Sequence, residues 1–151
     1  MNPIQIRKAT PDDLGAILPM MEAFNAFERI PWTRAAGEAP LRTLLSDASL
    51  GIVGLVEEGA MPLGYFVVTF GYDLEWNGRD AFLTELFVVA EARGRGIGRI
   101  ALERAESLAR EHGVNALHLM VRPENENAHR LYLLAGYASP PRVLLTKLLT
   151  R

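Results

Sequence analysis

The sequence predicts a single-domain α/β protein, with a mixed β-sheet and helices on both of its faces. Three observations predict this class. The first is a series of strand-length apolar runs separated by turn residues, and the second is an apolar run followed by a glycine-rich turn, a helical pattern and another strand. The third is size, because 151 residues, 49% of them hydrophobic, can fill one core. We therefore expect residues 1–151 to form one domain.

The N-terminal part predicts two helices. Thr10-Pro11-Asp12-Asp13 combines an N-cap, a proline at the first helical position and acids at the positive end of a helix, so a helix is expected over residues 11–27. Pro19 lies inside it and predicts a kink or a break, because proline removes one backbone hydrogen bond. A second, short helix is expected at residues 41–45.

Three strands follow these helices. Residues 51–57 and 63–75 are rich in Val, Phe and Tyr, and a short turn separates them, so they predict an antiparallel pair. Asn77-Gly78 is a strong signal for a type I′ hairpin, which would pair the second of these strands with a third at residues 80–89. A three-stranded meander is the expected result.

The next elements predict a parallel crossover. After the segment Arg93-Gly94-Arg95-Gly96-Ile97-Gly98-Arg99, apolar residues recur at helical spacing until Gly113 supplies a stop. Residues 117–122 then form the next strand. A strand, helix and strand in this order require a parallel pair, so the strands that contain Glu85 and Leu119 should run parallel.

The C-terminal part predicts one more helix and one more strand. Asn125 is placed to cap a helix over residues 127–135, and Gly136 is placed to end it. Residues 143–149 are expected to return as the final strand.

Residues 93–99 have the chemistry of a diphosphate-binding loop. Glycines allow close backbone approach, the N–H groups of a helix start point outward, and three arginines add positive charge. A solvated charge run is the alternative, but glycines interleaved at a helix start favour phosphate. The dinucleotide fingerprint G-x-G-x-x-G would need glycine in place of Arg99, and the sequence has no G-x-x-x-x-G-K-[ST].

The spacing R-x-x-G-x-G, made by Arg93, Gly96 and Gly98, resembles the acetyl-coenzyme A loop of the GNAT family of N-acetyltransferases. Residues 82–89, Phe-Leu-Thr-Glu-Leu-Phe-Val-Val, resemble the central strand of that family, and residues 125–137 resemble its N-x-x-A-x-x-L-Y-x-x-x-G-[FY] helix. The resemblance extends from Leu63 to Tyr137. It departs at Ala90, where the family often has proline.

The resemblance implies a single-domain GNAT fold, whose central sheet is splayed between two parallel strands and holds acetyl-coenzyme A (acetyl-CoA) in the split. The pantetheine arm would pair with the main chain at the end of the central strand, and the diphosphate would lie on the loop that follows. The implied cofactor-binding residues are Phe87, Val88, Val89, Arg93, Gly94, Arg95, Gly96, Ile97, Gly98, Arg99, Asn125 and Tyr132.

The resemblance also implies two catalytic residues. Tyr132 would be the general acid that protonates the departing coenzyme A thiolate, and the alternative is an aromatic wedge beneath the cofactor. Glu85 is the only carboxylate in the apolar central strand, so burial should raise its pKa. In several relatives a glutamate at this place acts as a base, often through water, and the resemblance implies the same role here. The alternative is that Glu85 only pairs with a cationic substrate or an arginine.

The expected activity is acetyl-CoA-dependent N-acetylation of a primary amine on a small molecule or peptide, by direct attack in a ternary complex. The alternative is a catalytically weak sensor of acyl-CoA. Replacing Tyr132 by phenylalanine would separate the two, because an enzyme would slow while its cofactor affinity stayed unchanged. Neither the acceptor amine nor the preferred acyl chain can be read from the sequence.

Composition excludes several other classes of function. The chain has no cysteine, so it has no disulfide, thiolate metal site or cysteine nucleophile. No histidine pair has metal-ligand spacing, and a net charge of −2 gives no general attraction to nucleic acid. No apolar run approaches the roughly 20 residues that span a bilayer, and the N-terminus does not resemble a signal peptide. We therefore expect a cytoplasmic protein without a metal, with a homodimer left open.

Overall fold

The structure is a computed structural model that describes residues 2–150, in two compact units that divide between residues 120 and 121. The first unit contains all five strands and three of the four helices of this described range. These elements are β1 (Ile4–Lys8), α1 (Leu14–Phe27), α2 (Arg34–Ser46), β2 (Gly51–Glu58), β3 (Met61–Asp73), β4 (Gly78–Val88), α3 (Ile97–Glu111) and β5 (Ala116–Leu119). The second unit contains α4 (Glu126–Leu134).

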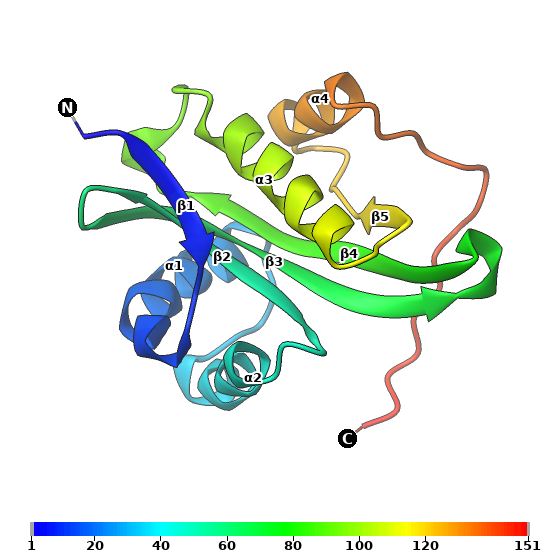
Figure 1. Cartoon of the computed structure of the whole chain (residues 1–151), viewed down its shortest axis with the longest axis horizontal. Helices are drawn as coiled ribbons and strands as arrows, with labels where there is room; N and C mark the ends of the chain where they lie inside the picture. The colour runs from blue at the N-terminus through cyan, green and yellow to red at the C-terminus, as the bar shows by residue number, and fades with distance from the viewer. Residues whose placement is uncertain (1, 151) are drawn as a thin grey trace. The chain divides into compact units, whose positions relative to one another are not determined.

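The sheet is mixed, as predicted. Its strand order is β1-β2-β3-β4-β5, with antiparallel pairing up to β4 and parallel pairing of β4 with β5 (Figure 1). Strand β5 pairs only with Asp80–Leu83, whereas β4 continues to Val88. Residues 84–88 of β4 therefore have no partner strand on this side, at the place where the resemblance implied a split in the sheet.

Helices cover both faces of this sheet, again as predicted. Helices α1 and α2 lie on one face, and α3 lies on the other (Figure 1). The first face packs Ile17 and Leu41 of the helices against Leu55, Tyr65 and Phe87 of the strands. On the other face, α3 packs closely against β3 and β4, because most of the side chains that it buries there are small. The buried side chains include Ala101, Leu102, Ala105, Leu108 and Ala109.

A β-bulge in β4 decides which face receives Glu85. Val67 of β3 pairs with Glu85, but the next residue, Val68, pairs with Leu83, so Thr84 is an extra residue in β4. Paired residues share a face and neighbours along a strand alternate, so the bulge places Leu83 with Val68 on the α3 face. Glu85 is then placed with Val67 on the face that α1 and α2 cover.

The helices differ from prediction in two respects. Helix α1 continues through Pro19 without a break. Proline has no amide hydrogen, so the Gly15 carbonyl loses its helical hydrogen bond. Both residues lie on the exposed side of the helix, where water can bond to that carbonyl. Helix α2 begins at Arg34, well before Leu41, and the Thr33 side chain caps it by accepting a hydrogen bond from the Ala36 amide. Gly37 and Pro40 concealed this longer helix in the sequence.

The β3–β4 hairpin forms as predicted, but its turn differs. Asp73 pairs with Gly78, and a 3-10 turn at Leu74–Trp76 precedes Asn77, whose φ is 60°. The φ of Gly78 is 146°, so Asn77-Gly78 is not the predicted two-residue type I′ turn.

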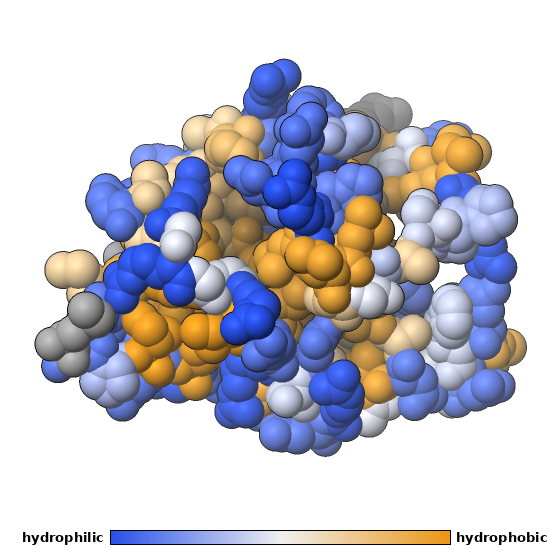
Figure 2. All heavy atoms as spheres, turned by 90° about the horizontal axis from the view of Figure 1, so that it is seen from above, coloured by the Kyte–Doolittle hydropathy of each residue, from blue (hydrophilic) through white to orange (hydrophobic). Residues whose placement is uncertain are grey.

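The C-terminal strand predictions were wrong. Strand β5 ends at Leu119, and residues 143–149 form no strand. Their apolar residues occur in adjacent groups, so they lack the alternation that would give a strand one buried face. The side chains of Val143, Leu144, Leu145, Leu148 and Leu149 are exposed, and apolar side chains reach the surface in several places (Figure 2).

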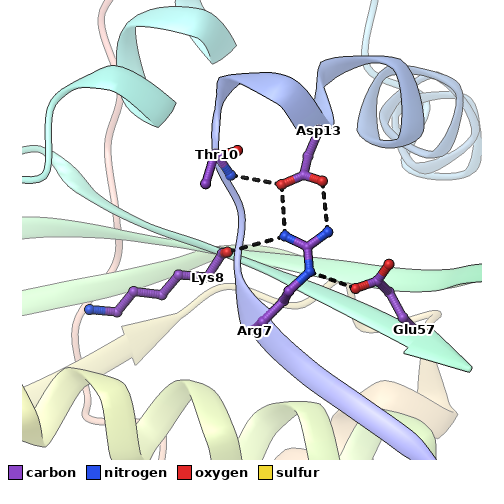
Figure 3. A network of polar contacts seen from close by, with 5 residues as sticks. All are labelled: Arg7, Lys8, Thr10, Asp13 and Glu57. Carbon is purple, nitrogen blue, oxygen red and sulfur yellow. Dashed lines mark hydrogen bonds and ion pairs between the residues drawn. The ribbon is translucent and has the colours of Figure 1, made fainter. Parts of the chain in front are cut away.

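An ion-pair network fastens β1 to the start of the first helical segment and to β2 (Figure 3). The Arg7 guanidinium donates to both carboxylate oxygens of Asp13, at 2.8 and 2.9 Å, and its Nε donates to Glu57 Oε1 at 2.7 Å. The Thr10 amide also donates to Asp13, at 2.8 Å, which completes the predicted N-terminal cap. These contacts hold the pKa of Asp13 below its usual value, with the hydrogen bond from Arg7 as the largest cause.

Replacing Arg7 by methionine should lower the free energy of unfolding by about 1 kcal/mol at neutral pH, because bidentate ion pairs are stronger than ordinary surface pairs but solvent screens a half-exposed guanidinium. The folded-state pKa of Asp13 is lowered, so this contribution is present above the unfolded value of about 3.9 and is lost as the pH falls through the folded value. Urea unfolding at several pH values measures it.

Arg42→Met is the matched control, because Arg42 approaches Glu38 only to 3.9 Å and both side chains are more than half exposed. It should change the free energy of unfolding little. Equal losses in the two variants, or a loss at Arg7 that persists at low pH, would contradict the prediction.

Candidate active site

Residues 93–99 form an exposed main-chain turn that ends in a helix start. Gly94 and Gly96 have φ values of 78° and 77°, a region that favours glycine, and α3 begins at Ile97. The first backbone hydrogen bond of α3 runs from the Ile100 amide to the Gly96 carbonyl, at 3.2 Å. The amides of residues 97–99 precede it and have no partner within the helix, and the N-cap residue, Gly96, has no side chain that could accept from them. This arrangement suits an anion.

The three arginines of the loop lie in three different environments. Arg93 donates from Nε to the Val88 carbonyl at 3.0 Å, and its guanidinium lies 5.6 Å from the ring centres of Phe27 and Phe87. Arg95 forms an ion pair with Glu58 at 2.9 Å, and this pair lowers the pKa of Glu58. Arg99 has a 71% exposed side chain at the start of α3. Arg93 and Arg95 thus fix the loop to β4 and β2, while Arg99 projects from it.

The end of β4 presents main-chain groups to the open side of the sheet. The Val89 amide donates to the Leu63 carbonyl at 2.9 Å, so Val89 is bonded to β3. The residue before it, Val88, pairs opposite Gly64, and because backbone groups alternate along a strand, the Val88 amide faces away from β3. It faces the side on which β5 no longer pairs with β4. The Phe87 side chain packs in the core, 6.1 Å from the Tyr65 ring.

Glu85 lies largely buried beside a tyrosine that sequence reasoning missed. The Tyr65 hydroxyl donates a hydrogen bond to Glu85 Oε1 at 2.6 Å, and Tyr65 itself has no exposed surface. Burial raises the pKa of Glu85 above its ordinary value, as predicted, and the hydrogen bond from Tyr65 opposes part of that rise. A tyrosine within an apolar strand was the available signal, because a buried hydroxyl needs a partner.

The second unit contains the other two predicted site residues. Asn125 caps α4, because its side chain accepts a hydrogen bond from the Ala128 amide at 3.3 Å. Gly136 has a φ of 99° and follows the helix, as predicted. The Tyr132 ring lies edge-on to Tyr137, with ring centres 6.0 Å apart.

Two of the three histidines, His112 and His118, have structural contacts, and His129 is exposed on α4. His118 Nε2 lies 3.1 Å from the buried Asp80 carboxylate, and His112 Nδ1 lies 2.8 Å from the Leu108 carbonyl near the end of α3. Among residues 2–150, no three acidic or histidine side chains gather as metal ligands. No helix within the same range is both long and apolar enough to cross a bilayer.

A loop of free amides after a central strand whose end lacks a partner on one side fits the arrangement that the sequence resemblance implied. Residues 17–137 match the acetyltransferase (GNAT) family. The chain belongs to this family. This acetyltransferase is 28% identical over 143 residues to thialysine N-epsilon-acetyltransferase of Bos taurus, covering 88% of this chain and 83% of that protein. It is also 28% identical over 134 residues to the uncharacterized N-acetyltransferase YhfO of Bacillus subtilis (strain 168), covering 89% of each chain.

Solved structures show the same fold. An integron cassette protein from the mobile metagenome of Cole Harbour Salt Marsh superposes with a TM-score of 0.86 at 28% identity, over 97% of this chain and 91% of that one. The aminoglycoside N-acetyltransferase AAC(6')-Iy, solved in complex with CoA, superposes with a TM-score of 0.85 at 16% identity, over 99% and 97% of the two chains. Together with the named relatives, the family makes this protein an acyltransferase.

Proposed function

We propose that this acetyltransferase moves the acetyl group of acetyl-CoA to a primary amine of a small molecule or peptide, by direct attack in a ternary complex. The observation that carries the proposal is the run of amides at residues 97–99, which follows two left-handed glycines and precedes the first hydrogen bond of α3. A diphosphate supplies the oxygen acceptors that such amides need. The structural neighbour solved with CoA and the relatives named for amine acetylation support the same reading.

The cofactor would bind along the open edge of β4. Its diphosphate would lie on the amides after Gly96, with Arg99 adding positive charge, and its pantetheine arm would pair with Val88 in the manner of an added strand. The Val88 amide would then donate to the thioester oxygen, where negative charge develops during attack. Arg93 would act indirectly, by holding the Val88 carbonyl in place.

The reaction would form one bond and break another without a covalent enzyme intermediate. The amine nitrogen attacks the thioester carbon, the carbon–sulfur bond breaks, and the thiolate leaves. Glu85 takes the proton that the amine loses, directly or through water, since its raised pKa makes it a better acceptor than an ordinary glutamate. Tyr132 donates a proton to the departing sulfur, which is the role that the family resemblance implies for it.

Calorimetric titration with CoA tests the proposal, with Gly96→Ala as the variant. Its new side chain meets nothing within 4 Å, so the change acts only through the backbone φ of 77°. A left-handed conformation costs a non-glycine residue about 1–2 kcal/mol, so the loop without ligand should leave this conformation. CoA binding would then have to restore it, and CoA affinity should fall about 5- to 30-fold.

Gly15→Ala is the control, because the added side chain also meets nothing within 4 Å and no left-handed φ is involved. Its CoA affinity should equal that of the wild type. Absence of saturable CoA binding to the wild type would end the proposal, and equal affinities in all three proteins would remove the loop from it.

A further inference from the structure

Tyr65 is fully buried and has a defined partner for each part of its side chain. It has no exposed surface, and its ring lies between Phe24 of α1, edge-on at 6.4 Å, and Phe87 of β4 at 6.1 Å. The register pairs Tyr65 with Phe87, and Glu85 lies two residues earlier on the same face. Within these contacts, the Tyr65 hydroxyl donates a hydrogen bond to Glu85 Oε1 at 2.6 Å.

The Tyr65 hydroxyl also affects the protonation of Glu85. A hydroxyl that donates to a carboxylate stabilises the ionised form, and burial favours the neutral form. Burial and the neighbouring Glu85 raise the pKa of Tyr65, so its hydroxyl keeps the proton that it donates. The Tyr65 hydroxyl therefore orients the Glu85 carboxylate and opposes part of the rise in pKa that burial causes.

We propose that Tyr65 is a positioning residue of the acetyl-transfer reaction, whose hydroxyl orients the Glu85 carboxylate and favours its ionised form, in which it can accept the proton of the amine. This inference rests on the proposed role of Glu85 as base. Tyr65 itself touches neither the cofactor nor the acceptor in this scheme. It acts on the reaction through Glu85.

Other charged groups belong to the elements around Glu85. They include the exposed Glu22 of α1, Glu28 just after α1, the exposed Glu38 and Arg42 of α2, Arg93 over the Phe87 ring, and the Asp80–His118 pair farther along β4 and β5. From α1 the side chains packed on this face include Ile17, Met21 and Phe24, which carry no charge. Burial and the Tyr65 hydroxyl are the two causes that shift the pKa of Glu85.

Tyr65→Phe tests the inference, because it removes one oxygen and keeps the ring. Loss of a hydrogen bond to a charged group should raise the pKa of Glu85 by about one to two units. Carbon-13 NMR titration of labelled glutamate side chains, with Glu85→Gln to assign the signal, measures this pKa without any activity. The acid limb of kcat/KM should move to higher pH by the same amount, and the rate should recover to within a few-fold on the alkaline plateau.

Tyr72→Phe is the matched control, because it removes the same hydroxyl from a tyrosine of the same strand whose side chain is 77% exposed. It should leave both the NMR titration of Glu85 and the pH dependence of kcat/KM unchanged. An unshifted Glu85 pKa and acid limb in Tyr65→Phe would overturn the inference.

Two further measurements keep the outcomes distinct. If Tyr65→Phe does not fold, the wild type still decides the question, because the Tyr65 ring carbon bearing the hydroxyl should titrate in step with Glu85 and a flat signal would refute the pairing. If Glu85→Gln keeps the wild-type rate and acid limb, then the proposed role of Glu85 fails. A shifted NMR pKa in Tyr65→Phe would survive that result, so the two failures can be told apart.

Discussion

Replacing Glu85 by glutamine should lower kcat by about 100-fold or more, because general-base catalysis contributes at least that much when the base is correctly placed. Glutamine has nearly the same shape, and its amide oxygen can still accept the hydrogen bond that Tyr65 donates at 2.6 Å. The fold and the affinity for CoA should therefore be kept. Initial rates with acetyl-CoA and an accepting amine, measured beside calorimetry with CoA, test this.

The pH dependence sharpens the same prediction. A base must be ionised to accept a proton, and burial raises the pKa of Glu85, so the wild-type rate should fall on acidification through a value above the ordinary glutamate pKa of about 4.3. The rate of Glu85→Gln should not show this fall on acidification, which is the acid limb of the pH profile. Glu38→Gln, on the exposed side of α2, is the control and should retain both rate and limb. Near wild-type activity of Glu85→Gln would leave Glu85 as a substrate-binding or structural group.

The second large effect is expected at Gly64, where alanine should lower the free energy of unfolding by about 3 kcal/mol, at the upper end of overpacking costs. A Cβ at Gly64 would lie 2.3 Å from the Phe87 carbonyl oxygen, which is backbone and cannot rotate away. Strands β3 and β4 would have to separate at the point where Val88 faces the open edge. Urea unfolding measures the loss, and calorimetry should show weaker CoA binding.

Gly71→Ala provides the comparison on the same strand. Its Cβ would lie 2.6 Å from Asp80 Oδ1, a side-chain atom that can shift while Oδ2 keeps its 3.1 Å contact with His118. The loss of stability should be about 1 kcal/mol or less, within the range of ordinary single substitutions. Comparable losses at Gly64 and Gly71 would show that the close approach of β3 to the Phe87 carbonyl is not the decisive contact.

Local signals predicted most of the fold. Helix α3 and its end before Gly113 followed from apolar periodicity and a glycine stop, and α4 followed from Asn125 and Gly136. The parallel pairing of β4 with β5 followed from the order of elements alone. Each of these features depends on residues close together in the chain, so a sequence pattern can contain it.

Features that depend on distant partners could not be predicted in this way. The pairing of Tyr65 with Glu85 and of Arg95 with Glu58 joins residues from different strands and loops. The bulge at Thr84 is a property of the register between two strands, and neither strand shows it alone. The apolar residues at 143–149 predicted a strand, but their grouping gives no single buried face.

The single extra residue at Thr84 divides β4 into two segments whose alternation of side chains is out of step. Before it, Ala81 and Leu83 face the layer built by α3, where a substitution is a question of packing. After it, Glu85 and Phe87 face the opposite layer, where a substitution alters acidity and the shape of the reactive edge. The face that Glu85 and Phe87 occupy therefore depends on one inserted residue, because deletion of Thr84 would restore plain alternation and turn both side chains toward α3.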